Sequence, residues 1–172
     1  LVGSEMCIRD RLTAFFIDGK DMIYSVSVNG DGRPPYKNLN TGTFTNKGIE
    51  FEARYQICKN LNLDMNYSYL HMSKPIPGAP GHKFYAGATY MPGRFTLNVN
   101  MQSVFDLYTD AEYSKKEDFT TLNAKVAYRF GTRDKGLNLF VKGENLTATR
   151  YTINDGFPMP KAIFMGGIDV TF

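Results

Sequence analysis

The sequence has 172 residues, of which 22% are charged and 14% aromatic, and its formal net charge is +3 at pH 7. This length is enough for one domain with a real core, and the balanced charge argues against a nucleic-acid partner. No apolar run approaches the ~18 residues of a membrane-spanning helix. In barrel strands, however, apolar and polar residues alternate, so a hydropathy window averages out their apolar signal.

The first residues do not read as a natural start. Translation of CTCGTGGGCTCGGAGATGTGTATAAGAGAC gives residues 1–10, and this DNA resembles a sequencing-library adaptor that carries a transposase mosaic end. We therefore expect residues 1–11 to be adaptor-derived and not part of the fold. Residues 12–172 are then expected to come from the interior of a longer gene and to form one domain.

Cysteine and histidine usage predicts no metal site and no cofactor. Setting Cys7 aside leaves Cys58 alone in a turn, so a disulfide framework is not supported. His71 and His82 lack cysteine or carboxylate neighbours at the spacing of metal ligands.

Alternating apolar and polar side chains predict strands along the rest of the chain. The pattern is strict from residue 48 to 57, where Glu50, Glu52 and Arg54 all fall opposite the apolar side chains. The predicted strands are residues 12–25, 43–57, 61–71, 82–91, 95–108, 119–130, 137–151 and 162–172. A bulge or bend is expected at 18–21, and loops are expected at 29–35, 109–118 and 152–161.

The fifth and the last predicted strands carry specific expectations. In 95–108, Phe105 and Leu107 are predicted on the apolar face and Asp106 on the polar face. The chain ends on an alternating strand, and a final strand closing on Phe resembles the terminal signal by which Gram-negative outer-membrane barrels are recognised for insertion. The side chains of this predicted assembly signal are Phe164, Ile168, Val170 and Phe172.

Three features distinguish this pattern from a soluble sandwich, which also alternates. Several strands are predicted to run ten residues or more, longer than usual in globular proteins. Connections are short after the second, fourth and sixth strands and longer after the others, and aromatic residues gather near strand ends. We therefore predict an all-β fold: an antiparallel up-and-down meander of about eight strands, an open section of a transmembrane β-barrel.

The polar face is predicted to line a water-filled lumen. Its candidate side chains are Glu50, Glu52, Arg54, Asn98, Asn100, Gln102, Lys125 and Arg129. Most are expected to form a hydrated wall whose charges pair across strands, and Tyr36, Tyr113 and Asp155 in the outside loops are better placed for substrate contact. Ser68 and Ser103 lie near no histidine in the pattern, so no catalytic site is predicted.

Several stretches, in order, resemble the C-terminal part of a TonB-dependent outer-membrane receptor. Residues 46–52 resemble its N-x-G-h-E-h-E strand (h, apolar), 79–83 its proline-plus-histidine strand entry, 122–130 its L-N-A-x-V-x-Y strand, 141–151 its V-x-N-L-h-x-x-x-Y segment, and 156–160 its G-h-P-M-P-G-R loop. Lys161 and Ala162 stand where the last motif has Gly-Arg, so the subfamily stays open.

This resemblance implies a barrel of ~22 strands filled by a plug, in the bacterial outer membrane. It implies active uptake of a scarce nutrient, such as a ferric siderophore, cobalamin or a glycan, driven through TonB. The expected partners are outer-membrane lipid, the barrel-assembly machinery through the last strand, and TonB in the full-length protein only. A truncated section is not expected to transport alone. The alternatives are a complete eight-stranded structural or adhesive barrel, an outer-membrane enzyme, and a soluble carbohydrate-binding sandwich.

Overall fold

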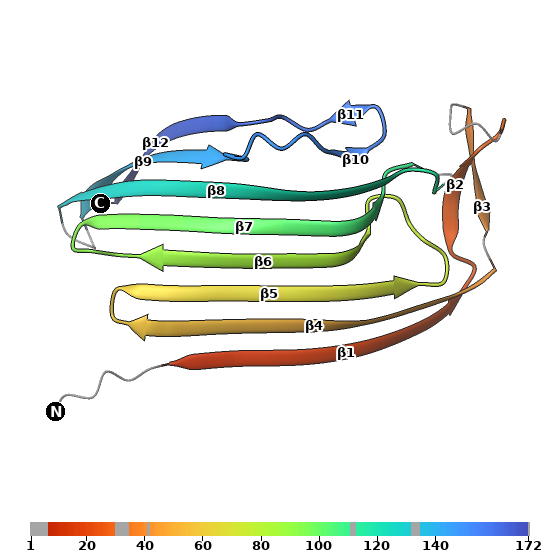
Figure 1. Ribbon diagram of the computed structural model, residues 1–172, viewed down its shortest axis with the longest axis horizontal. Helices are drawn as coiled ribbons and strands as arrows, with labels where there is room; N and C mark the ends of the chain where they lie inside the picture. The colour runs from red at the N-terminus through yellow and green to blue at the C-terminus, as the bar shows by residue number, and fades with distance from the viewer. Residues whose placement is uncertain (1–6, 30–34, 41, 111–112, 132–134, 172) are drawn as a thin grey trace.

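The computed structural model describes residues 7–29, 35–40, 42–110, 113–131 and 135–171. These residues form one eight-stranded antiparallel sheet and two small hairpins (Figure 1). The sheet consists, in spatial order, of β1 (Ile8–Lys20), β4 (Thr43–Cys58), β5 (Leu61–Met72), β6 (Pro80–Tyr90), β7 (Phe95–Tyr108), β8 (Lys116–Gly131), β9 (Gly136–Glu144) and β12 (Ile163–Thr171). The hairpins are β2 (Ile23–Ser27) with β3 (Tyr36–Asn40), and β10 (Thr152–Asn154) with β11 (Phe157–Pro158).

The sheet is an open meander, as predicted. Each strand pairs antiparallel with the next sheet strand along the chain, and β1 and β12 are the two edges. A complete eight-stranded barrel would need those edges to pair with each other, and the order of the sheet does not include that pairing. No helix in the described part of the chain is long and apolar enough to cross a membrane.

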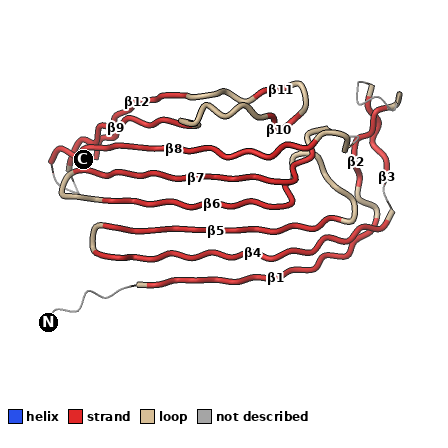
Figure 2. Tube along the Cα trace, in the orientation of Figure 1, coloured by secondary structure: helices blue, strands red, loops and turns tan. Residues whose placement is uncertain are grey.

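The connections differ at the two ends of the sheet. Residues 59–60 join β4 to β5 and residues 91–94 join β6 to β7, both at the same end (Figure 2). The longer connections, including the β2–β3 and β10–β11 hairpins, lie at the opposite end (Figure 1). This is the alternation of short and long connections that the sequence predicts for a barrel wall.

One face of the sheet is apolar and uncovered. The register sets Phe51 opposite Tyr67 and Tyr67 opposite Phe84, so the apolar rows continue from strand to strand. Large apolar side chains on the rows are exposed, for example Leu12 at 71% and Val141 at 61%. The buried hydrophobic side chains of the described residues are Val104, Leu107, Phe119 and Ala127. A soluble sandwich would press this face against a second sheet, so that alternative is wrong for the described residues.

Several predicted boundaries shift. Predicted strand 12–25 divides into β1 and β2, because the backbone turns at Asp21, whose φ is 62°. Predicted strand 137–151 ends at Glu144, and Asn145 follows with a φ of 49°, a left-handed conformation that asparagine tolerates. β8 begins at Lys116, inside the predicted loop 109–118, and the predicted loop 152–161 contains the β10–β11 hairpin.

A β-bulge in β7 reverses the predicted faces of Asp106 and Leu107. The register against β8 shifts between Val104 and Leu107, and Asp106 has a φ of 55°. Leu107 consequently packs with Val104 in a buried cluster, whereas Asp106 lies 3.9 Å from His82 on the apolar side. The prediction that Leu107 is apolar-facing and Asp106 polar-facing is therefore wrong, because one extra residue reverses the alternation beyond it.

Residues 8–11 continue β1 and pair with β4, with Arg11 opposite Glu52. Asp10 falls on the apolar face, opposite Ala53, where a natural barrel strand would rarely carry a charge. Backbone pairing does not reveal the origin of a segment, so the adaptor origin of residues 1–11 stays a prediction; residues 1–6 lie outside the described part.

Candidate functional site: the polar wall

The face opposite the apolar rows is the polar wall, the candidate functional surface. The cross-strand register brings the predicted lumen-facing residues onto this one face. Its rows are Glu50–Ser68–Lys83, then Glu52–Asn66–Tyr85–Gln102–Thr121, then Arg54–Asp64–Gly87–Asn100–Asn123, then Gln56–Asn62–Thr89–Asn98–Lys125–Lys142, and finally Arg129–Asn138–Asp169. The shared face is thus established, whereas contact with a lumen remains a prediction.

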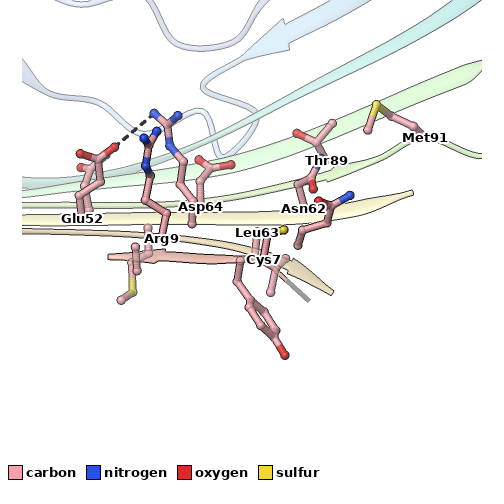
Figure 3. A pocket seen from close by; sticks show the side chains of 14 residues that line it. Cys7, Arg9, Glu52, Asn62, Leu63, Asp64, Thr89 and Met91 are labelled. Carbon is pink, nitrogen blue, oxygen red and sulfur yellow. Dashed lines mark ion pairs between the residues drawn. The ribbon is translucent and has the colours of Figure 1, made fainter. Parts of the chain in front are cut away.

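Glu52 is the centre of charge pairing on the β4 side of the wall. Its carboxylate accepts from Arg54 at 3.2 Å and from Arg11 at 3.0 Å. Glu52 and Arg54 border a hollow of about 560 Å³ that Asp64 also lines (Figure 3). Arg9 and Cys7 complete its rim, and both belong to the predicted adaptor-derived segment, so we do not place the functional site here.

A directed chain of asparagine side chains crosses the centre of the wall. The Asn123 amide donates to Asn100 at 2.9 Å, Asn100 donates to Asn98 at 3.0 Å, and Asn98 donates to the Thr89 hydroxyl at 2.8 Å. Asn123 in turn accepts from the backbone N–H of Asn145 at 2.9 Å. The chain therefore runs from the end of β9 to β6 and satisfies these part-buried amides without charge.

Residues 145–162 join β9 to β12. Within this connection, residues 145–161 form a strap that packs against the polar wall. Asn145 is its hub and is only 5% exposed. Its side-chain Nδ2 donates both to Thr149 O at 2.9 Å and to Pro160 O at 3.1 Å, so it holds the two legs of the strap together. Its Oδ1 accepts from the Thr149 N–H at 3.0 Å and from the Thr147 hydroxyl at 3.1 Å.

Three further cationic side chains of the wall, Lys125, Arg129 and Lys142, lie on β8 and β9. Lys125 and Lys142 are directly opposite each other, a repulsive position. Each has a compensating neighbour: Lys142 forms an ion pair with Glu144 at 2.5 Å, and Lys125 lies 4.3 Å from the centre of the Phe140 ring. Arg129 faces Asn138, which donates to Asp169 at 3.2 Å.

The predicted loop residues have structural partners. Asp155 forms an ion pair with Lys115 at 2.6 Å, and Tyr113 packs edge-on against Tyr108 with ring centroids 5.5 Å apart. Tyr36 is the first residue of β3 and is about half exposed. Substrate contact by these three residues stays a prediction. Among the described residues, no group of three or more histidine, cysteine or acidic side chains is placed to hold a metal ion.

Sequence reasoning missed the residues that fix the strap. Phe119 and Tyr151 stack between β8 and the strap, and they join Val104 and Leu107 in the buried cluster. The available signal was the V-x-N-L-h-x-x-x-Y motif, which contains both Asn145 and Tyr151. Their roles depend on a contact with β8 that no local pattern contains.

A two-faced antiparallel wall with short and long ends is the architecture of a section of a transmembrane β-barrel. A family model described as "TonB dependent receptor-like, beta-barrel" matches residues 11–146. The chain belongs to this TonB-dependent receptor family, whose members are transporters and not enzymes.

Solved structures share the fold. One is described as "Copper transporter OprC", with a TM-score of 0.75, 19% identity, and cover of 96% of this chain and 29% of that one. Another is BauA, the ferric preacinetobactin receptor from Acinetobacter baumannii, with a TM-score of 0.67, 20% identity, and cover of 94% and 27%. The chain thus spans less than a third of the length of either relative.

Proposed function

We propose that this chain is the C-terminal barrel section of an outer-membrane receptor that takes up a scarce nutrient with energy supplied through TonB. The observation that supports this most is the pairing of an uncovered apolar face with a hydrogen-bonded polar wall in a chain of this family. The expected cargo is a ferric siderophore, cobalamin or a glycan. The two similar structures, described as a copper transporter and a ferric preacinetobactin receptor, support a metal-related cargo most directly.

In this proposal the edges of the sheet continue into the rest of one larger barrel. β1 and β12 each have a neighbour on one side only, and an unpaired edge is unfavourable in hydrocarbon. The polar wall then faces the lumen, including Glu50, Gln102 and Arg129. TonB would act only on the full-length protein.

The apolar rows are proposed to contact lipid hydrocarbon. On β6, Tyr90 lies eight residues beyond His82, about 27 Å along the strand at the usual rise, which is close to the ~25 Å apolar band of such barrels. At the His82 end, the bulge in β7 turns Asp106 to this face, where it forms a 2.7 Å ion pair with Lys116 of β8. These charges mark the lipid headgroup level at one end of the strands. Tyr90, Phe95 and Tyr128 mark the headgroup level at the opposite end.

The last strand is proposed to be the part recognised by the barrel-assembly machinery. Phe164, Ile168 and Val170 alternate along β12 and are 70%, 64% and 61% exposed. Phe172 lies outside the described residues. An exposed apolar row on a free edge is a surface that another strand can extend.

Uptake in cells that carry the intact gene tests the function. Accumulation of labelled ferric siderophore, cobalamin, oligosaccharide or copper is measured in wild-type cells, in a deletion strain, and in a strain without TonB. We expect one cargo to be lost equally in the last two strains. If the gene deletion changed the uptake of none of these cargoes, the proposal would be contradicted.

A further inference from the structure

The strap covers a second hollow in the polar wall. This hollow has a volume of about 240 Å³ and lies between β7, β8 and the strap. Gln102, Thr121 and Asn123 line it from the wall. From the strap it is lined by Asn145, Tyr151, Ile153, Met159, Pro160 and Lys161. Its accessibility therefore depends on where the strap lies.

The base of the strap, residues 145–151 and 159–161, is held by buried contacts. Asn145 clamps both legs, and the Leu146 N–H donates to Leu122 O of β8 at 2.7 Å. The Tyr151 ring stacks on Phe119, which is only 8% exposed. Buried hydrogen bonds and packed rings are costly to break, so the base moves only with β8.

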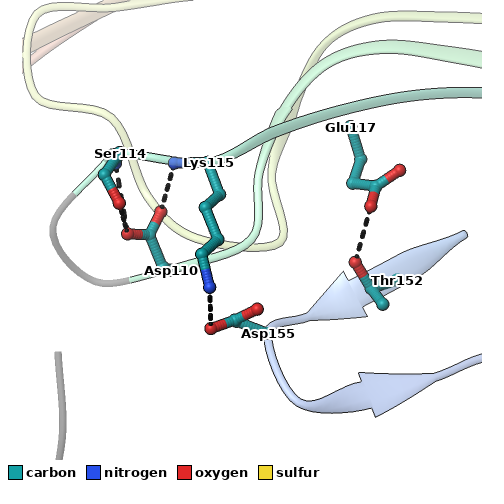
Figure 4. A network of polar contacts seen from close by, with 6 residues as sticks. All are labelled: Asp110, Ser114, Lys115, Glu117, Thr152 and Asp155. Carbon is teal, nitrogen blue, oxygen red and sulfur yellow. Dashed lines mark hydrogen bonds and ion pairs between the residues drawn. The ribbon is translucent and has the colours of Figure 1, made fainter.

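The tip of the strap, residues 152–158, is held differently. Its contacts reach the connection between β7 and β8 and the first residues of β8 (Figure 4). They are the Lys115–Asp155 ion pair at 2.6 Å, the bond from Thr152 to the Glu117 carboxylate at 2.9 Å, and the bond from the Asp155 N–H to Thr109 O at 2.8 Å. The side chains of the ion pair are 57% and 47% exposed, and exposed pairs stabilise weakly.

A neck separates the two parts. The Met159 N–H donates to Tyr151 O at 3.0 Å, which closes the hairpin at the level of the Phe119 stack. Beyond the neck the hairpin contains only β10 and β11, and Phe157 at its tip is 74% exposed. The tip can therefore leave its contacts as one small hairpin without disturbing the base.

We propose that the strap is a hinged cover over this hollow, with a fixed base and a releasable tip. Release moves Ile153, the tip residue that lines the hollow, away from Thr121. This opens the tip side of the hollow to small polar solutes, while the base and the wall keep their hydrogen bonds. The cover is a property of the chain itself. Its test is therefore independent of uptake, and the hinged cover and the uptake function can each be contradicted without the other.

Residue-resolved hydrogen exchange on the intact protein that carries this chain tests the hinge, with rates normalised to the intrinsic rate of each amide. The variant Asp155→Ala combined with Thr152→Val removes two tip contacts. We expect exchange at position 155 to rise about fivefold or more, because the variant loses an exposed ion pair and a part-buried hydrogen bond. Amides at Asn145, Leu146 and Thr149 should be unchanged.

Two further variants make the result decisive. Asn145→Ala should accelerate both base and tip amides, because it releases both legs. Asp169→Ala, a matched loss of a carboxylate elsewhere on the wall, should change neither. Equal acceleration of base and tip in the tip variant would show one cooperative unit and overturn the hinge, and so would a tip variant whose position 155 exchanges at the wild-type rate.

Discussion

Phe119 of β8 and Tyr151 of the strap stack with ring centroids 3.9 Å apart and ring planes 20° apart. This contact joins two segments more than thirty residues apart on the polar side of the sheet. It extends the buried cluster of Val104 and Leu107, the only one formed by buried residues of the described chain. An otherwise polar wall therefore has one small hydrophobic core beneath the strap.

Replacing Tyr151 by alanine should remove most of this core. We expect a loss of about 2–3 kcal/mol in the free energy of unfolding, from lost packing and lost ring stacking. Urea titration of the protein in detergent micelles measures it. The matched variant Tyr151→Phe keeps the stack and should lose less than about 1 kcal/mol; equal losses in both variants would show that the hydroxyl, and not the stack, matters.

Substitution at the centre of the hydrogen-bonded asparagine chain should destabilise the protein. Asn100→Leu leaves the Asn98 carbonyl and the Asn123 amide without their partner, at an expected cost of about 1–3 kcal/mol. Asn66→Leu, on the same wall but outside the chain, provides the control. Thermal unfolding of the two variants should rank Asn100→Leu clearly lower; an equal or reversed ranking would count against the chain.

The bulge at Asp106 predicts an unusual deletion effect. Removing Asp106 restores strict alternation, so Leu107 would leave the buried cluster and turn towards the apolar face. Asp106→Gly keeps the bulge and suits its positive φ. We expect the deletion to destabilise the protein more than the glycine variant does. Chemical denaturation compares the two, and a better tolerated deletion would contradict the bulge.

The carboxylate of Asp110 organises the loop after β7. Partial burial raises its pKa, but the Ser114 hydroxyl at 2.5 Å and the Lys115 and Ser114 N–H groups at 2.9 and 3.1 Å outweigh this and hold the pKa below its ordinary value of 3.8. A lowered pKa gives stability that is present above the ordinary value and is lost as pH falls through the folded value.

The Ser114 amide should therefore stay protected from exchange at pH 5 and lose protection only below 3.8. Asp110→Asn should make protection insensitive to pH in this range. Amide resonances followed by NMR from pH 6 to pH 2.5 report both effects. Protection that instead disappeared near pH 5 in the wild type would mean a raised pKa.

The sequence predicts those parts of the fold that depend on local alternation. β4, β5 and β7 each lie within one residue of their predicted bounds. On β4, Glu50, Glu52 and Arg54 leave only one possible apolar face. The bulge at Asp106 and the end of β9 at Asn145 were missed. Both depend on a residue in a left-handed conformation that is stabilised by distant partners, Lys116 in one case and the strap in the other.

The polar wall was also predictable only where local alternation decides. Which residues share a face comes from strand period alone, so all the predicted members lie on it. Which of them bond to each other depends on strand pairing and side-chain length. Asn98 and Asn100, two residues apart on β7, therefore form a chain with Asn123 that no single-strand pattern specifies.

The direction of the two faces is the central claim, and the chain offers a clean probe because it has no tryptophan. Val99→Trp and Asn98→Trp place the probe on adjacent residues of β7, on the apolar face and the polar wall respectively. In the intact protein reconstituted in vesicles, lipids brominated along the acyl chain should quench fluorescence strongly at position 99 and weakly at position 98, after subtraction of any native tryptophan signal. Equal quenching, or stronger quenching at 98, would contradict the account.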